Sequence, residues 1–310
     1  MREILEIPLY TAKRRWIPFL VCLVLSMLVS LATFGCTIKK TIKIEVPQKI
    51  LQAKTASFEE LLGMLQRYDR IHSLSSSLDV TYFSGKKESG VIQEIRKQPG
   101  YILLRRPNST RLVVQNFVTG TRELEVLSVE DDLSIYYRRE NALYIGKNSA
   151  KDLIAENGGN SAGFTVPIRG EHIYEAIFPQ SIQINAPGFL YSKEEESDPG
   201  AKYYVLNVYR EGATKRIHVV RKIWIERSSL SVARQQVYLD EGQMVSDIIY
   251  SDEIEVDGLK LPLRIRIDRP LDGYALNLEF KSWRIDPDLP DNAFSLKLPE
   301  GVQVIHLIEK

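Results

Sequence analysis

Apolar residues recur at every second position over much of the chain, which is the spacing of strands with one buried face. The first such segments are Leu78–Phe83 and Gly90–Lys97. A second series covers Tyr203–Tyr209, Ile217–Glu226, Ser231–Tyr238, Val245–Val256, Leu263–Asp268 and Tyr274–Ile285. The pattern therefore predicts two groups of strands, separated by an irregular middle part.

Short groups of turn-forming residues separate the predicted strands. They include Gly85-Lys86-Lys87, Pro99-Gly100, Pro107-Asn108, Thr119-Gly120, Glu130-Asp131-Asp132, Glu140-Asn141, the acidic run Glu194–Gly200, Asp257-Gly258 and Asp272-Gly273. The two Asp-Gly pairs are strong hairpin signals. Because turns this short leave no room for helical crossovers, we expect antiparallel meanders.

Two stretches have helical spacing instead. Ser57 is a suitable N-cap with Glu60 as its capping-box partner, so we expect a helix over Phe58–Ile71. A second predicted helix covers Glu171–Phe178, and Pro179 ends it. The glycine-rich residues 157–163 between the two strand groups predict a loop.

These elements predict a mainly β fold with a minor helical part. About a dozen strands cannot stay in one flat sheet, so we expect a large curved antiparallel sheet that curls or closes. The short helices would cap it. We expect residues 57–310 to form a single domain, because strand-and-turn folds of about 200–250 residues commonly do so.

The N-terminus has a different pattern. Three basic residues, Lys13, Arg14 and Arg15, precede the largely apolar run Trp16–Phe34, whose length suits a cleaved signal or a membrane-spanning anchor. The run ends at Gly35-Cys36, which resembles the bacterial lipobox. That resemblance implies a signal peptide over residues 1–35 and diacylation of Cys36. The alternative is an uncleaved anchor.

Both alternatives place the rest of the chain outside the cytoplasmic membrane, facing the periplasm of a cell envelope. Residues 36–56 are rich in lysine and indicate a tether. Thr37 stands where some lipoproteins retained at the inner membrane have Asp, which favours the outer membrane over the inner one. The other cysteine, Cys22, lies in the apolar run, so the sequence offers no disulfide framework.

Charge and motifs exclude several classes of function. With 41 basic and 40 acidic side chains the formal charge is +1, so nothing indicates nucleic-acid binding. The four histidines have no metal-binding spacing, and we expect no metal or cofactor. Ser161 lies in a G-x-S-x-G sequence, but polar residues precede it and Phe164–Pro167 follow it. We therefore expect a flexible glycine loop there and no enzyme.

Several short motifs resemble the lipoprotein-sorting LolA/LolB superfamily over residues 57–308. In the first half they are Pro99-Gly100-Tyr101, Arg105-Arg106-Pro107 and Asp132–Tyr137. In the second half they are Trp224-Ile225-Glu226, Tyr250–Pro262 and Phe294–Val302. The exported part is longer than the usual carrier of that superfamily. The resemblance implies an unclosed β-barrel around an apolar cavity, with short helices as a lid over the opening. The cavity would bind acyl chains of lipoproteins or other lipids.

Candidate binding residues follow from the two helices and one apolar segment. We expect lid contacts from Leu61, Leu62, Leu65, Ile173, Tyr174, Ile177 and Phe178, although the same stripes are typical of ordinary core. Phe189-Leu190-Tyr191 is either an exposed loop that touches membrane or cargo, or the start of a buried strand.

Two functions are compatible with these patterns. The first is an envelope lipoprotein that binds lipid or lipoprotein acyl chains in a hydrophobic cavity without catalysis. The alternative is a structural lipoprotein that binds another envelope protein and carries no lipid. A hollow cavity would favour the first, since a barrel filled by its own side chains cannot hold an acyl chain.

Overall fold

The computed structural model describes residues 52–84, 93–150, 153–155, 168–178, 187–212 and 215–309. They belong to the larger of two compact units, Gln48–Lys310. Cys36, Ser161 and the predicted turn Gly85-Lys86-Lys87 lie outside the described residues.

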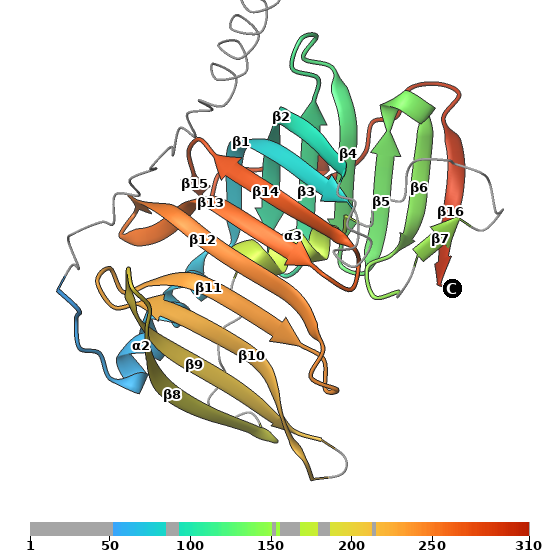
Figure 1. Ribbon diagram of the computed structural model, residues 1–310. Coiled ribbons are helices and arrows are strands. Elements are labelled where there is room, and N and C mark those ends of the chain that lie inside the picture. The colour runs from blue at the N-terminus through green and yellow to red at the C-terminus, as the bar shows by residue number, and fades with distance from the viewer. Residues whose placement is uncertain are drawn as a thin grey trace, which may run out of the picture. The chain divides into compact units, whose positions relative to one another are not determined.

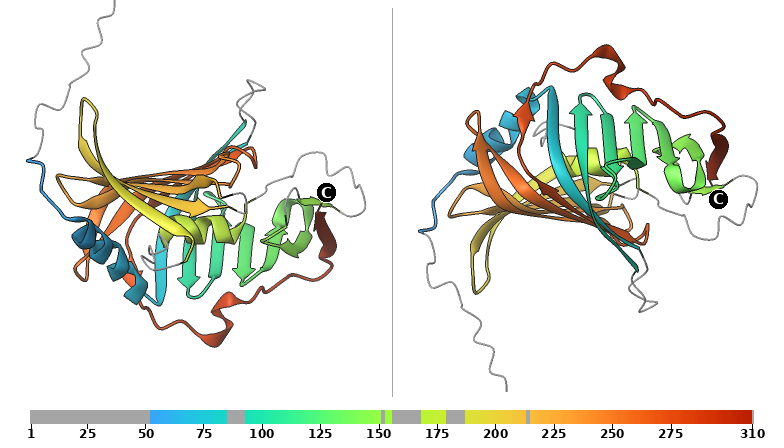
Figure 2. Two further views of the ribbon diagram at one scale, coloured as in Figure 1. Left: turned by 90° about the horizontal axis from the view of Figure 1, so that it is seen from below. Right: turned by 90° about the horizontal axis from the view of Figure 1, so that it is seen from above.

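The described strands form one large sheet that curves strongly (Figures 1 and 2). The first meander consists of β1 (Ser73–Ser84), β2 (Gln93–Arg105), β3 (Ser109–Gln115), β4 (Arg122–Val129), β5 (Asp132–Tyr137) and β6 (Ala142–Lys147). The second consists of β8 (Phe189–Ser197), β9 (Lys202–Glu211), β10 (Ile217–Glu226), β11 (Ser231–Tyr238), β12 (Met244–Val256), β13 (Leu259–Arg269) and β14 (Tyr274–Phe280). The shorter strands are β7 (Leu153–Ala155), β15 (Arg284–Ile285) and β16 (Gln303–Glu309).

The two meanders join through β1 and β14, which pair antiparallel with Leu78 opposite Phe280. The sheet order runs from β7 at one edge to β8 at the other, and these edge strands are not paired with each other. The predicted fold class, a mainly β protein with one large unclosed sheet and a few short helices, is therefore confirmed.

Both predicted helices are present. Helix α2 (Phe58–Gln66) continues into the 3₁₀ turn η1 (Arg67–Arg70), and its N-terminus has the expected capping box. The Ser57 hydroxyl accepts from the Glu60 amide, while the Glu60 carboxylate accepts from the Ser57 amide at 2.7 Å. Helix α3 (Gly170–Ile177) lies within one residue of its predicted bounds. The described residues form two further 3₁₀ turns, η3 (Arg138–Glu140) and η4 (Asp291–Phe294).

The described residues bury two hydrophobic clusters, one under each helix. The α3 cluster joins α3 to both meanders and includes Leu74, Ile102, Leu112, Ile173 and Leu276. The α2 cluster lies between α2 and strands β9 and β10, and includes Leu61, Leu62, Leu65, Tyr204, Leu206 and Ile223. Each helix thus buries its apolar face against a different part of the sheet.

Three local predictions were wrong. Pro99-Gly100 does not form a turn but lies inside β2. A Cβ at Gly100 would come within 2.2 Å of the Val113 carbonyl oxygen on β3. Glycine is required there by the close approach of two strands. The acidic run begins as part of β8, and the turn is confined to the residues after Ser197, where the Asp198 carboxylate accepts from the Gly200 amide. The predicted strand Tyr274–Ile285 is two strands, β14 and β15.

The expectation of a wholly antiparallel sheet was also wrong. Strand β16 pairs in parallel with β6, with Val304 opposite Leu143. A long segment between β15 and β16 makes this possible, since it carries the chain across the sheet to the far side of β6. Parallel neighbours always need such a crossover connection.

This crossing segment, residues 286–302, runs over the face of the first meander opposite to α3 (Figure 2). A fully buried carboxylate, Glu125 on β4, holds it in place through two arginines. Arg111 contacts Glu125 at 2.7 Å and donates to the Ala293 carbonyl at 2.7 Å. Arg122 also pairs with Glu125, and it donates to the Lys297 carbonyl at 2.7 Å. One buried ion triad therefore fixes the route of the crossing segment.

Candidate ligand-binding clefts

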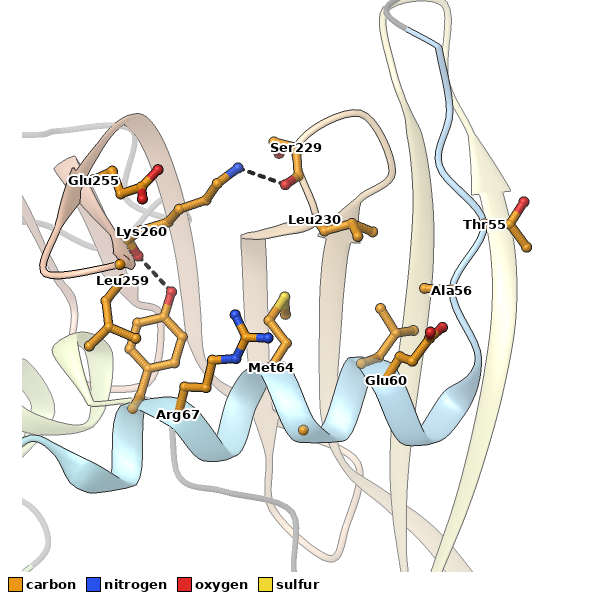
Figure 3. A pocket seen from close by; sticks show the side chains of 14 residues that line it. Thr55, Ala56, Glu60, Met64, Arg67, Ser229, Leu230, Glu255, Leu259 and Lys260 are labelled. Carbon is orange, nitrogen blue, oxygen red and sulfur yellow. Dashed lines mark hydrogen bonds between the residues drawn. The ribbon is translucent and has the colours of Figure 1, made fainter.

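A cleft of about 630 Å³, here called the helix cleft, lies between α2 and two turns of the second meander (Figure 3). The turns are those between β10 and β11 and between β12 and β13. Apolar side chains of Leu61, Met64, Leu230 and Leu259 contribute to its walls, and so do the charged side chains of Glu60, Arg67, Glu255 and Lys260. The cleft therefore combines an apolar lining with a few polar groups.

Local sequence explains how the walls of the helix cleft form. The buried face of α2 packs into the α2 cluster, which leaves Gly63 and Met64 beside the cleft. A Cβ at Gly63 would meet no atom within 4 Å. The opposite wall is the β12–β13 hairpin, where Asp257 and Gly258 both have positive φ (51° and 76°), the type I′ turn that this pair of residues predicts.

A second, smaller cleft of about 320 Å³, here called the sheet cleft, lies on strands β11–β13 next to the end of α3. Val232, Tyr250 and Leu261 line it from the sheet, and Ile177 lines it from α3. Its three carboxylates have their own partners: Asp252 pairs with Arg264 at 2.9 Å, Glu253 pairs with Lys260 at 3.2 Å, and Glu226 accepts from the Ser228 hydroxyl at 2.6 Å.

The two clefts meet at Tyr68, Ser229 and Lys260, which line both. The Lys260 ammonium donates to the Ser229 carbonyl at 2.7 Å, as Figure 3 shows. The Tyr68 hydroxyl donates to the Lys260 carbonyl at 2.6 Å. Burial raises the pKa of the Tyr68 hydroxyl to about 12, so this donor keeps its proton at neutral pH.

Arg106 fixes the position of Tyr68. Its guanidinium donates to the backbone carbonyls of Tyr68 at 3.1 Å and Ile71 at 2.8 Å. The same group lies 4.6 Å from the centre of the Phe178 ring, just after α3. Arg106 thus connects η1 to the end of α3, and these two elements flank the sheet cleft.

The predicted lid residues are mostly core. Leu61, Leu62 and Leu65 are buried in the α2 cluster, and Leu61 also lines the helix cleft. Ile173, Tyr174, Ile177 and Phe178 are buried in the α3 cluster, and Ile177 also lines the sheet cleft. The seven residues therefore belong to two different clusters. Only Leu61 from the first cluster and Ile177 from the second also line a cleft.

The apolar segment Phe189-Leu190-Tyr191 begins the edge strand β8 and is not a loop. Phe189 and Tyr191 are half-buried against the α2 cluster, while Leu190 remains 50% exposed. The structure therefore has a strand here, as one of the two interpretations expected, but it is an edge strand of half-buried and exposed residues and not a buried one. A role of Leu190 in contacting membrane or cargo stays a prediction.

Sequence reasoning missed a more exposed apolar pair. Phe117 and Val118 are 79% and 87% exposed at the tip of the β3–β4 hairpin. The tip is well ordered by hydrogen bonds, because the Asn116 side chain accepts from the Val118 and Thr119 amides at 2.9 and 3.0 Å. The sequence did contain a signal for this exposed pair, because Phe117 and Val118 stand between Asn116 and Thr119-Gly120, which are typical of a turn.

A basic turn lies beside this apolar tip. Leu124 on β4 pairs with Tyr137 on β5, so η3, which follows Tyr137, is at the same end of the sheet as the β3–β4 hairpin (Figure 1). Arg138 and Arg139 in η3 are exposed. Neighbouring strands lie about 4.8 Å apart, which places the two turns within about 10–15 Å of each other.

The described part of the chain contains no group of three or more His, Cys, Asp or Glu side chains that could hold a metal ion. His172 is buried and contacts the Tyr274 hydroxyl at 2.6 Å. Burial lowers the pKa of His172 well below its ordinary value, so the ring is neutral. Among the same residues, no helix is long and apolar enough to cross a membrane.

The sequence matches no protein-family model and no curated protein. The structure of this chain is similar to the crystal structure of a DUF1329 family protein from Desulfovibrio piger. The two have 17% identity and a TM-score of 0.48, and the match covers 76% of this chain and 94% of that one. It is also similar to a LolA superfamily protein from Nitrosomonas europaea, with 13% identity, a TM-score of 0.46, and coverage of 78% and 99%. A structure described as an outer membrane lipoprotein-sorting protein domain, from Vibrio parahaemolyticus, has 13% identity, a TM-score of 0.46, and coverage of 76% and 95%. The solved structures similar to this chain thus include a LolA superfamily protein.

Proposed function

We propose that this protein is an envelope lipoprotein that binds the acyl chain of a lipid or of another lipoprotein in the helix cleft, without covalent chemistry. The observation that carries this proposal is the open cleft of about 630 Å³ with Leu61, Met64, Leu230 and Leu259 in its walls. Its volume lies within the range of small-molecule sites, about 300–1,000 Å³. Each methylene buried there contributes about 0.8 kcal/mol.

The charged residues at the helix cleft suit the polar end of such a ligand. The guanidinium of Arg67 can contact a carboxylate or phosphate, while the chain lies along the apolar walls. The tether adds proximity to a membrane. From the proposed lipidation site at Cys36 to Thr55 at the cleft, the backbone spans at most about 65 Å. The site would therefore stay within reach of the bilayer that holds the anchor.

The hairpin tip supports a second contact with a membrane. Single exposed apolar residues are common on proteins, but an ordered adjacent pair as exposed as Phe117 and Val118 is suited to the interfacial region of a bilayer. Exposed Arg138 and Arg139 on the neighbouring turn can contact anionic headgroups. This arrangement would bring the carrier to the lipid surface that donates or accepts its cargo.

The second candidate function is a protein-binding lipoprotein without lipid cargo. Strand β8 favours it, because β8 is at the edge of the sheet and its outer backbone groups can pair with a strand of another protein. Exposed Glu194, Glu195 and Glu196 along β8 would select a partner of basic character.

The test of the first proposal is a substitution at Gly63. We expect Gly63→Trp to weaken binding of a fluorescent fatty acid at least tenfold, because a Cβ at this position points into open space and the indole would fill the helix cleft. Native mass spectrometry of residues 37–310 from an envelope fraction should show co-purified lipid on the wild type and none on the variant.

Gly63→Ala is the matched control. It should keep the ligand and raise the free energy of unfolding by about 0.8–1 kcal/mol, since alanine is the better helix former. Equal binding by Gly63→Trp and wild type would place the ligand elsewhere. A wild type that stays free of lipid after incubation with vesicles would instead favour the protein-binding function.

The membrane contact can be tested at the hairpin tip. The double substitution Phe117→Ser and Val118→Ser should weaken co-sedimentation of residues 37–310 with anionic vesicles about tenfold or more, because two apolar side chains leave the interface. Ile217→Ser in the β9–β10 hairpin removes another exposed apolar residue (57% exposed) and should change little. If both variants sediment like wild type, the tip does not contact the membrane.

A further inference from the structure

The helix cleft and the sheet cleft are adjacent but separated by one movable side chain. We propose that Lys260 forms the partition between them and thereby limits the length of the acyl chain that the protein accepts. This inference rests on the proposed function, because it concerns the same ligand. It identifies a specificity-determining residue that touches the far end of the chain.

The Lys260 side chain extends across the boundary between the helix cleft and the sheet cleft. The residue follows the β12–β13 turn at the start of β13, and its side chain reaches to the β10–β11 turn, where the ammonium donates to the Ser229 carbonyl at 2.7 Å (Figure 3). The Tyr68 hydroxyl meets the Lys260 backbone at 2.6 Å. Because the same three residues line both clefts, the boundary between the clefts consists of them.

Of these three residues, Lys260 is the one that can move. Tyr68 is buried, and Arg106 holds its backbone carbonyl. The Ser229 group at the boundary is its main-chain carbonyl. The Lys260 side chain is 34% exposed, and its second contact is an ion pair with the equally exposed Glu253 at 3.2 Å. Exposed ion pairs of this kind contribute little to stability, so removing the side chain should leave the fold intact.

The space beyond Lys260 can receive the end of an acyl chain. Ile177, Val232 and Leu261 offer apolar surface there, together with the buried ring of Tyr250. When Lys260 is removed, Asp252 in the same cleft keeps its pair with Arg264, and the exposed carboxylate of Glu253 remains in contact with water. With the lysine in place a chain must stop in the helix cleft, and without it the chain gains the sheet cleft of about 320 Å³.

The experiment measures affinity against chain length. Residues 37–310 are titrated with saturated fatty acids from decanoic to stearic acid, for wild type and Lys260→Ala. The affinity of wild type should rise with the length of the fatty acid and then level off. The chain length at which this happens is called the levelling point. In Lys260→Ala the chain length at which affinity stops rising should be longer than in wild type, because the sheet cleft of about 320 Å³ becomes accessible. Affinity for stearic acid should then rise at least about tenfold.

Three further variants make the result specific. Lys260→Arg keeps a long cationic side chain at the boundary, so its affinity should stop rising at the same chain length as in wild type. Lys281→Ala removes a lysine that pairs with Asp79 away from both clefts, and should also behave as wild type. Ala233→Leu narrows the sheet cleft and, added to Lys260→Ala, should return the levelling point to that of wild type.

The outcomes separate this inference from the proposed function. If wild type binds no fatty acid of any length, the proposed function fails and the partition with it. If wild type binds but Lys260→Ala levels off at the same length, Lys260 is not the partition while the carrier function stands. A longer limit in Lys260→Ala that Ala233→Leu does not reverse would place the extra chain outside the sheet cleft and overturn the inference.

Discussion

Replacing Glu125 by glutamine should lower the free energy of unfolding by about 3 kcal/mol or more. Its side chain is 0% exposed, and the side chains of its partners Arg111 and Arg122 are only 15% and 27% exposed. Removing one partner of a buried ion pair typically costs about 3–5 kcal/mol, because the remaining charge stays buried without compensation. Partial hydration of Arg122 places the expected value near the lower end. Urea unfolding followed by tryptophan fluorescence measures it.

Glu279→Gln is the matched control for Glu125→Gln. Glu279 pairs with Lys97 at 2.7 Å, but both side chains are well exposed. Such a pair contributes about 0–1 kcal/mol, so the control should unfold almost like wild type. Equal losses in both variants would mean that the Glu125 triad has no special role in holding the crossing segment.

Leu65→Ala is the second substitution with a large expected effect. Leu65 is 1% exposed and packs in the α2 cluster, and a buried Leu→Ala change costs about 2–5 kcal/mol. The loss should appear in the same urea titration. It should also weaken fatty-acid binding, because α2 forms one wall of the helix cleft and is held to the sheet by this face.

Leu298→Ala provides the comparison for Leu65→Ala. Leu298 is 39% exposed, and a surface substitution of this kind usually changes stability by less than about 0.5 kcal/mol. A similar small effect for Leu65→Ala would show that α2 is only loosely attached to the sheet. In that case the helix cleft would not be a fixed site.

Local chemistry made much of the fold predictable. Ser57 and Glu60 form the capping box that their spacing predicts, and Asp257-Gly258 forms the expected hairpin turn. Both signals depend on residues within four positions of one another. The alternation of apolar and polar residues likewise predicted the positions of most strands, because it depends only on which face of each strand is buried.

Long-range pairing was not predictable in the same way. Nothing in the sequence around Leu78 says that Phe280 lies opposite it, and nothing around Gln303 indicates a parallel partner. Pro99-Gly100 shows the same limit on a smaller scale. The residues are typical of a turn, but the neighbouring strand at Val113 is what requires the glycine.

The candidate site was predicted only in part for the same reason. The sequence identified the apolar stripe of α2, yet Leu62 and Leu65 on that stripe face the core. Residues that line the helix cleft, such as Arg67 and Lys260, come from elements far apart in the chain. Their meeting depends on the order of strands in the sheet, which local patterns do not encode.

The pairing of β1 with β14 also constrains when the protein can fold. One edge of β1 stays unpaired until Phe280 has been synthesised, so the sheet cannot be completed while most of the chain is still emerging from the ribosome. Contacts this distant in sequence form slowly. For the export that the N-terminal sequence predicts, this delay would be useful, because a chain that crosses a membrane through a secretion channel must remain unfolded until it has crossed. The strand order would thus help to keep the protein competent for export.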